Sequence, residues 1–195
     1  MARTIPENLA NTIQPTRPII NHYKKAEKMN SNLLFDFTVN KENKTIHVKR
    51  QFDAQLDLVW RAWTTAELLD QWWAPLPYRN ETKTLEFREG GTWHYRMISP
   101  ENQSHYCRFD YEKINPEKSY SGLDAFCDEE GNLNTEFSRM HWKNEFTQEN
   151  EITNVSITIS VDSLETLEKI IAIGFKEGFT MGLNQLDHLL ETYKK

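Results

Sequence analysis

Apolar and polar residues alternate along the chain from Leu33 onward. A period of two is typical of a strand that buries one of its faces. The alternation is interrupted at residues 41–44, which are all polar, and then resumes. The sequence therefore predicts a β-hairpin whose apolar positions are Phe35, Phe37 and Val39 before the turn and Ile46, Val48 and Phe52 after it.

The spacing of the apolar residues changes to three and four between residues 56 and 72, which predicts two short helices. In the first, Leu56, Val59, Trp60 and Trp63 share one face. The second runs over residues 65–72, with Thr64 or Thr65 as its N-cap, and ends before Pro75.

Strand patterns separated by turn residues dominate residues 83–161 and are followed by a helical pattern from Ser163 to about Tyr193. The order is a strand hairpin, two small helices, a run of strands and one long helix. That order predicts an α+β fold in which the C-terminal helix closes over a curved antiparallel sheet.

Two predicted hairpins bring aromatic residues to one face of the sheet. If residues 99–103 form a turn, that face carries Trp93, Tyr95, Met97, His105, Cys107 and Phe109. A turn near Asn150 adds Trp142, Asn144, Phe146, Thr153, Val155 and Ile157. This assignment of residues to one face depends on the register of each strand pair, because a slip of one residue in a strand moves every side chain of that strand to the other face.

Three glycines, Gly174, Gly178 and Gly182, recur every four residues in the predicted C-terminal helix. Each costs about 1 kcal/mol relative to alanine in a helix interior. Either the helix backbone packs closely against its neighbours here, or the glycines leave space for a ligand. The sequence leaves both explanations open.

A cavity between the sheet and this helix is the candidate ligand site. Its predicted lining is Trp93, Tyr95, Met97, His105, Phe109, Trp142, Asn144, Phe175, Gly178, Phe179 and Gly182. The alternative is that the large aromatic side chains fill the space themselves. We expect the other four tryptophans, Trp60, Trp63, Trp72 and Trp73, to serve core and hinge packing.

Charge and motifs narrow the function further. The net charge of −6 argues against partners such as nucleic acid or an anionic membrane. The six histidines have no metal-ligand spacing, and the sequence contains neither a glycine-rich phosphate loop nor a G-x-S-x-G motif. We therefore expect no metal, no cofactor and no catalytic motif.

We also expect a cytoplasmic protein, because the sequence has no secretion signal and no apolar run of membrane-spanning length. We expect it to be a monomer or homodimer. Cys107 and Cys127 fit reduced thiols, although the sequence leaves a disulfide between them open. Residues 1–30 are interrupted by prolines and predict a flexible arm before a domain at 31–195, with Met29 as the hypothesised natural start.

Three segments resemble one known superfamily. They are FDAQLDLVWRAWTTAELLDQWWAP at 52–75, LEFREGGTWHYRM at 85–97 and KEGFTMGLNQLDHLL at 176–190. The sequence is similar to the START-like (SRPBCC, helix-grip) superfamily over about residues 33–190. More narrowly, it resembles the C-terminal domain of the activator of the heat-shock-protein-90 ATPase and its stand-alone bacterial homologues. The eukaryotic co-chaperones carry a separate N-terminal domain, and we expect this sequence to have no room for it.

Three functions are considered for a sequence with this resemblance. The first is a non-catalytic module that holds a small apolar or amphipathic ligand, since helix-grip proteins commonly bind lipids, polyketides or hormones. The second is an interaction protein that modulates a chaperone ATPase. The third is an enzyme of cyclase or hydrolase type, for which Tyr95, His105 and Asn144 would be the acid–base or polarising groups. We favour the first.

Overall fold

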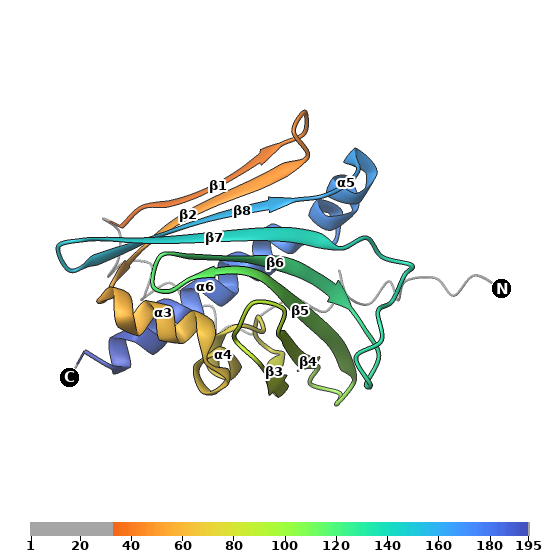
Figure 1. Ribbon diagram of the computed structural model, residues 1–195, viewed down its shortest axis with the longest axis horizontal. Helices are drawn as coiled ribbons and strands as arrows, with labels where there is room; N and C mark the ends of the chain where they lie inside the picture. The colour runs from red at the N-terminus through yellow and green to blue at the C-terminus, as the bar shows by residue number, and fades with distance from the viewer. Residues whose placement is uncertain (1–32, 195) are drawn as a thin grey trace.

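The computed structural model describes residues 33–194 (Figure 1). In this range the chain forms eight antiparallel strands, whose side chains alternate between the two faces of one sheet. The strands pair in the order β1-β2-β8-β7-β6-β5-β4-β3, so within residues 33–194 only the β2–β8 pair joins strands that are not consecutive in sequence. Their bounds are β1 Phe35–Asn40, β2 Thr45–Asp53, β3 Arg79–Leu85, β4 Thr92–Ile98, β5 Ser104–Asn115, β6 Ser119–Phe126, β7 Met140–Glu149 and β8 Ile152–Ser160.

The helices within residues 33–194 form two pairs, α3 Leu56–Thr64 with α4 Ala66–Trp72, and α5 Leu164–Ala172 with α6 Phe175–Thr192. Helix α6 runs behind the strands of the sheet, with α3 and α4 near its C-terminal half (Figure 1). The predicted α+β helix-grip fold is therefore confirmed. The face of the sheet toward α6 is called the inner face below.

The predicted single C-terminal helix is wrong, because it is broken into α5 and α6. Ser163 begins α5 as expected, and its hydroxyl accepts a hydrogen bond from the Thr166 N–H at 3.0 Å. Gly174 then adopts a left-handed conformation, with φ of +85°, between the two helices. Glycine adopts such a conformation at little cost because it has no Cβ atom. Gly174 thus redirects the chain, and the argument about glycine in a helix interior does not apply to it.

The predicted faces of both hairpins are confirmed. In the β4–β5 pair, Trp93 lies opposite Phe109, Tyr95 opposite Cys107 and Met97 opposite His105. In the β7–β8 pair, Asn144 lies opposite Ile157 and Phe146 opposite Val155, and Ile159 extends the face as the partner of Trp142. The inner face is accordingly the aromatic face of the sheet.

The C-terminal half of α6 is fixed to the rest of the molecule by both apolar and polar contacts. Leu183, Leu186 and Leu190 are buried in the core. Arg50 on β2 forms an ion pair with Asp187, and both side chains are almost buried. The Gln185 amide donates to the Trp72 and Ala74 carbonyls at 2.9 and 2.8 Å. This half of the helix is therefore anchored to β2 and to the end of α4.

Gly182 is the more closely packed of the two glycines inside α6. A Cβ atom at this position would lie 3.4 Å from the carbonyl oxygens of both Trp72 and Trp73. Gly178 is less tightly enclosed, since its Cβ would first meet Pro75 Cγ at 3.7 Å. The three predicted glycines therefore have three different surroundings, and the helix backbone approaches the end of α4 most closely at Gly182.

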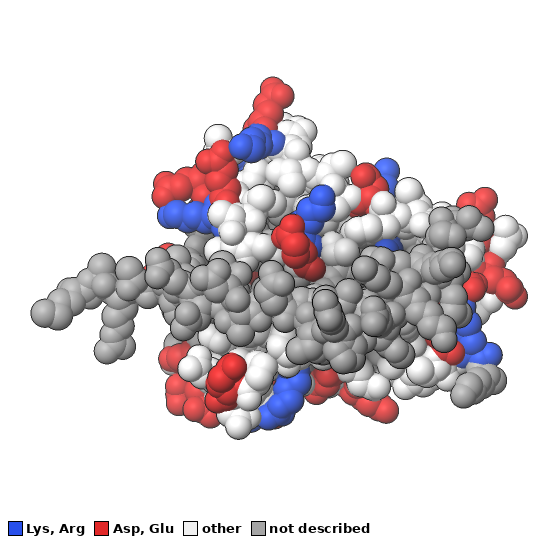
Figure 2. Space-filling model, turned by 180° about the vertical axis from the view of Figure 1, so that it is seen from behind, with Lys and Arg blue, Asp and Glu red and all other residues white. Residues whose placement is uncertain are grey.

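The surface seen from behind carries charges of both signs. Acidic and basic side chains are interspersed over the visible described residues of this face (Figure 2). Among residues 33–194, no helix is both long and apolar enough to cross a membrane. The predicted arm at residues 1–30 and the hypothesis about Met29 lie outside the described residues.

Candidate functional site

Trp73, the C-cap residue of α4, lies at the centre of a group of rings on the inner face. Its ring centroid is 5.2 Å from that of Trp93 on β4, 6.0 Å from Trp142 on β7 and 6.3 Å from Phe179 on α6. Together with Tyr95 and Phe175, these residues are called the inner aromatic cluster. Three elements and the end of α4 thus converge on the predicted site.

The rings of this cluster touch one another across the space where a cavity was predicted. Trp142 contacts Phe179 at 5.4 Å, and Phe179 stacks on Phe175 at 5.6 Å. Trp93 stacks on Tyr95 at 4.0 Å, and the Tyr95 hydroxyl accepts a hydrogen bond from Trp73 Nε1 at 3.1 Å. The side chains predicted to line a cavity therefore fill much of that space.

Exposure differs within the cluster. Trp93, Tyr95 and Trp142 on the sheet are nearly buried, at 3–4% exposure. Phe175 and Phe179 on α6 are only partly buried. The helix side of the cluster is thus the side on which a ligand could gain access by displacing rings.

Asn144 is the least satisfied polar side chain on the inner face of β7. It is 1% exposed, and neither its amide nitrogen nor its amide oxygen has a hydrogen-bond partner. It lies between Trp142 and Phe146 along the strand, opposite Tyr120 on β6 and Ile157 on β8. Leaving a buried polar group unpaired costs about 1–3 kcal/mol. An apolar residue would be the more stable choice for this position.

The remaining predicted residues lie on the same inner surface but outside the cluster. Phe109 packs against Tyr111 and Tyr120, with centroids 5.1 and 6.0 Å away, in a second group of rings. Met97 and His105 lie opposite each other where β4 ends and β5 begins, and the His105 ring is 6.2 Å from that of Tyr78. Sequence periodicity placed these residues on the correct face but could not tell which of them meet.

Asp124 on β6 is an inner-face residue that the sequence reasoning missed. It lies opposite Phe109 on β5 and Met140 on β7. Its carboxylate accepts hydrogen bonds from Trp142 Nε1 at 3.0 Å and from the Met140 N–H at 3.2 Å. Burial raises the pKa of Asp124 to about 7, against these stabilising donors. The alternation Tyr120, Gly122, Asp124 along β6 is the signal that could have found it.

Two neighbouring groups respond to the same buried environment. Burial raises the pKa of Tyr95 well above its ordinary value, and the nearby charge of Asp124 adds to this effect. Burial followed by the charge of Asp124 also raises the pKa of the Cys107 thiol. Both groups are therefore neutral near pH 7, and Cys107 has no thiolate character of the kind a nucleophile needs.

The three residues considered for an enzyme do not form a catalytic group in this structure. The hydroxyl of Tyr95 is bonded to Trp73, and the side-chain amide of Asn144 has no partner. Within residues 33–194, no hydrogen bond joins Tyr95, His105 and Asn144 to one another. In the same residues, no group of three or more His, Cys, Asp or Glu side chains could hold a metal ion.

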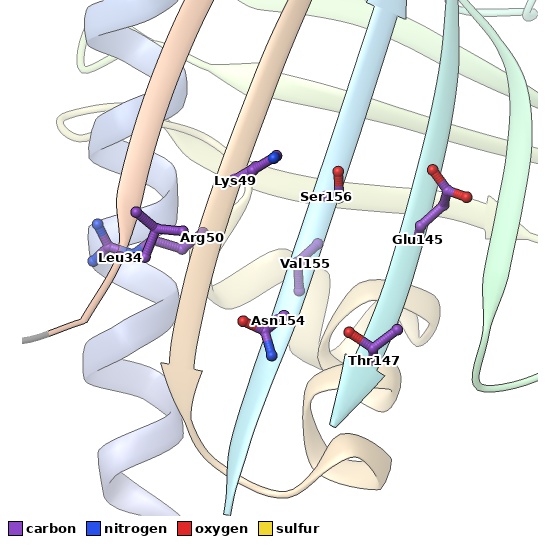
Figure 3. A pocket seen from close by; sticks show the side chains of 8 residues that line it. All are labelled: Leu34, Lys49, Arg50, Glu145, Thr147, Asn154, Val155 and Ser156. Atoms are coloured by element: carbon purple, nitrogen blue, oxygen red, sulfur yellow. The ribbon is translucent and has the colours of Figure 1, made fainter. Parts of the chain in front are cut away.

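A small pocket of about 100 Å³ is lined by residues that include no member of the inner aromatic cluster (Figure 3). Lys49, Ser156 and Glu145 contribute to it, and they alternate with inner-face residues, so they face away from α6. Its complete lining is Leu34, Lys49, Arg50, Glu145, Thr147, Asn154, Val155 and Ser156. Sites for small organic ligands usually measure about 300–1,000 Å³, so this pocket is too small to be the predicted site.

Comparison with known proteins identifies the family. The model of the family described as Activator of Hsp90 ATPase homolog 1-like protein matches residues 53–191. The chain belongs to this family, and its fold is the START-like helix-grip fold. No curated protein matches the sequence.

Solved bacterial structures share the fold. A protein from Mycobacterium smegmatis is 24% identical with a TM-score of 0.74, over 81% of this chain and 96% of that one. A protein from Arthrobacter aurescens is 24% identical with a TM-score of 0.76, over 80% and 91%. A protein from Staphylococcus epidermidis is 25% identical with a TM-score of 0.72, over 81% and 96%.

Proposed function

We propose that this protein binds a small apolar or amphipathic ligand between the sheet and α6. The observation that carries the proposal is the unpartnered amide of Asn144 in the middle of an aromatic wall. A ligand with one polar group could hydrogen-bond to this amide while its apolar part contacts Trp142 and Phe146. Binding would then offset the energetic cost that Asn144 imposes on the unliganded protein.

Access requires the first turns of α6 to move, because Phe175 and Phe179 occupy the space beside Trp142. Gly174 immediately precedes these turns and has a conformation suited to a hinge. Farther along, Asp187 and Gln185 hold the helix to β2 and α4. The proposed motion is therefore confined to the N-terminal half of α6.

The free energy of apolar burial at such a site is sufficient to bind a small-molecule ligand. Apolar burial contributes about 25 cal/mol per Å². A ligand that buries roughly 400 Å² gains about 10 kcal/mol before ordering and displacement costs are subtracted. The net result is an affinity of about micromolar strength.

A thermal-shift screen tests the proposal with fatty acids, aromatic compounds and polyketide-like compounds as probes. We expect at least one class to raise the melting temperature of the wild-type protein, and the Asn144→Leu variant to lose part of that shift. Thr153→Val is the matched control, because Thr153 is also buried on the inner face but its hydroxyl is bonded to the Ala54 carbonyl at 2.7 Å. No shift with any class would contradict the proposal.

A second candidate function is modulation of a chaperone ATPase, which the description of the matched family supports. Adding the protein to the heat-shock-protein-90-type ATPase of its own source organism should change ATP turnover if this function applies. Unchanged ATP turnover over a wide range of molar ratios of the two proteins would contradict this second function. In either case we expect a cytoplasmic monomer or homodimer, which size-exclusion chromatography with light scattering and cell fractionation would check.

A further inference from the structure

The inner face carries one acidic side chain whose position suggests a specific kind of ligand. Asp124 lies on β6 between Phe109 on β5 and Met140 on β7, and its carboxylate lies within hydrogen-bond distance of the Trp142 indole. It is partly buried rather than fully exposed. A carboxylate in such a place has lost much of its water and needs partners to replace it.

The hydrogen bonds of Asp124 supply only part of that replacement. Each carboxylate oxygen accepts one N–H group, from Met140 and from Trp142. Arg139 directs its guanidinium to the Asp124 backbone carbonyl and to the carboxylate of Asp110 instead. Among the ion pairs of residues 33–194, none includes Asp124. The carboxylate of Asp124 therefore has no cation paired directly with it, although the Arg139 guanidinium is close enough to lower its pKa.

The side chains around this charge are those that stabilise organic cations. Trp142 directs its indole N–H at the carboxylate, Tyr95 is close enough for its pKa to respond to the charge, and Phe175 and Phe179 pack on Trp142. Aromatic faces attract ammonium groups, and a carboxylate strengthens that attraction through a charge-assisted hydrogen bond. The acidic protein as a whole, with a net charge of −6, favours the approach of cations as well.

We propose that the ligand of the inner face is an organic amine, whose ammonium group pairs with Asp124 while its apolar body contacts the inner aromatic cluster. The inference rests on the proposed ligand-binding function and specifies its chemistry. It assigns Asp124 as the charge-selecting residue. Asn144 and the aromatic rings would contribute to the binding of charged and neutral ligands alike.

A matched pair of probes tests the inference by isothermal titration calorimetry. 2-Phenylethylamine and 2-phenylethanol have the same apolar body and differ in the charged group. At about pH 8.5, where Asp124 is ionised, we expect the wild-type protein to bind the amine about tenfold more tightly than the alcohol. In the Asp124→Asn variant the two affinities should agree within about twofold.

The control variant is Glu145→Gln, which removes one negative charge from the opposite face of the same sheet. It should keep the wild-type preference, and thermal unfolding should show that both variants fold. Equal binding of amine and alcohol by the wild-type protein, or a preference that survives in Asp124→Asn, would overturn the inference and leave the proposed function intact. Binding of neither probe would overturn the inference, and if the neutral panel also fails to bind, the proposed function fails with it.

Discussion

The indole Nε1–H of Trp142 donates a hydrogen bond to the carboxylate of Asp124 at 3.0 Å, across the β6–β7 pair. This bond joins the largest side chain on the inner face of β7 to the acidic group of β6. It also fixes the edge of the indole, so that the ring presents its sides to Phe175 and Phe179. Apolar contact and charge are thereby combined at one point of the sheet.

The raised pKa of Asp124 predicts a specific dependence of stability on pH. Because the folded-state pKa of about 7 exceeds the ordinary value of 3.8, the folded protein retains a proton that the unfolded chain loses between these values. The resulting stabilisation is complete below the lower value and is lost as the pH rises through 7. We expect the free energy of unfolding to fall more between about pH 5 and pH 8 in the wild type than in Asp124→Asn.

Urea denaturation at several pH values measures this difference. The nearby groups are Tyr95 on β4, Cys107 on β5 and Arg139 just before β7. They keep one charge state over this range because the first two have raised pKa values and arginine stays protonated. Histidines and other carboxyls are common to both proteins and cancel in the comparison. Parallel pH profiles for the wild type and the variant would show that Asp124 is not buried as described.

The unpartnered amide of Asn144 predicts that a loss of function can accompany a gain of stability. Replacing Asn144 by leucine removes two unsatisfied polar atoms from a site that is 1% exposed. We expect the free energy of unfolding to rise by about 1–3 kcal/mol while ligand binding weakens. Guanidinium denaturation provides the measurement.

The Thr153→Val variant should behave in the opposite way. The Thr153 hydroxyl donates to the Ala54 carbonyl, so its removal leaves that acceptor unpaired and should lower stability by about 1 kcal/mol. If Asn144→Leu destabilises the protein as much as Thr153→Val does, the amide is satisfied in solution and the main argument for a ligand is lost.

The break between α5 and α6 predicts opposite effects for two glycine substitutions. Gly174→Ala forces a side chain into a left-handed conformation and should destabilise the protein by about 1–2 kcal/mol. Gly178→Ala lies within α6, where the new Cβ meets Pro75 at an ordinary contact distance of 3.7 Å, and should stabilise the protein by up to about 1 kcal/mol. Thermal unfolding shows whether each substitution raises or lowers the stability of the protein. A change in the same direction for both variants would contradict the described helix break.

The Arg50–Asp187 ion pair predicts that α6 is strongly attached to β2 through its C-terminal half. Both side chains are about 10% exposed, so removing either partner leaves a buried charge. We expect Arg50→Met or Asp187→Leu alone to cost about 3–5 kcal/mol, and the double variant to recover most of this loss. A double-mutant cycle of unfolding free energies measures the coupling. If the loss of stability in the double variant equals the sum of the two single losses, Arg50 and Asp187 do not interact and are solvated.

Much of the fold could be predicted because local patterns determine it. The β4–β5 register followed from strict alternation on both sides of the turn at residues 99–103. The break at Gly174 was missed because the apolar spacing of Ile170, Ile171, Phe175 and Phe179 continues through it. Periodicity reports which face a residue occupies and does not report the φ angle of a single glycine.

The candidate site was harder to predict than the fold. Trp73 was assigned to packing, yet its ring joins residues from β4, β7 and α6. Whether rings line a cavity or fill it depends on side-chain volumes and rotamers brought together from distant segments. Asp124 was missed because no face was assigned to β6, and its perturbed pKa arises only from burial in the folded protein.

The side-chain amide resonances of Asn144 in ¹H–¹⁵N NMR spectra test the central claim most directly. Their assignment follows from their absence in the Asn144→Leu variant. Titration with compounds that shift the melting temperature should move these resonances in a saturable manner, together with the indole resonance of Trp142. If binding compounds leave the Asn144 amide unchanged and perturb only residues outside the inner face, the site between the sheet and α6 is wrong.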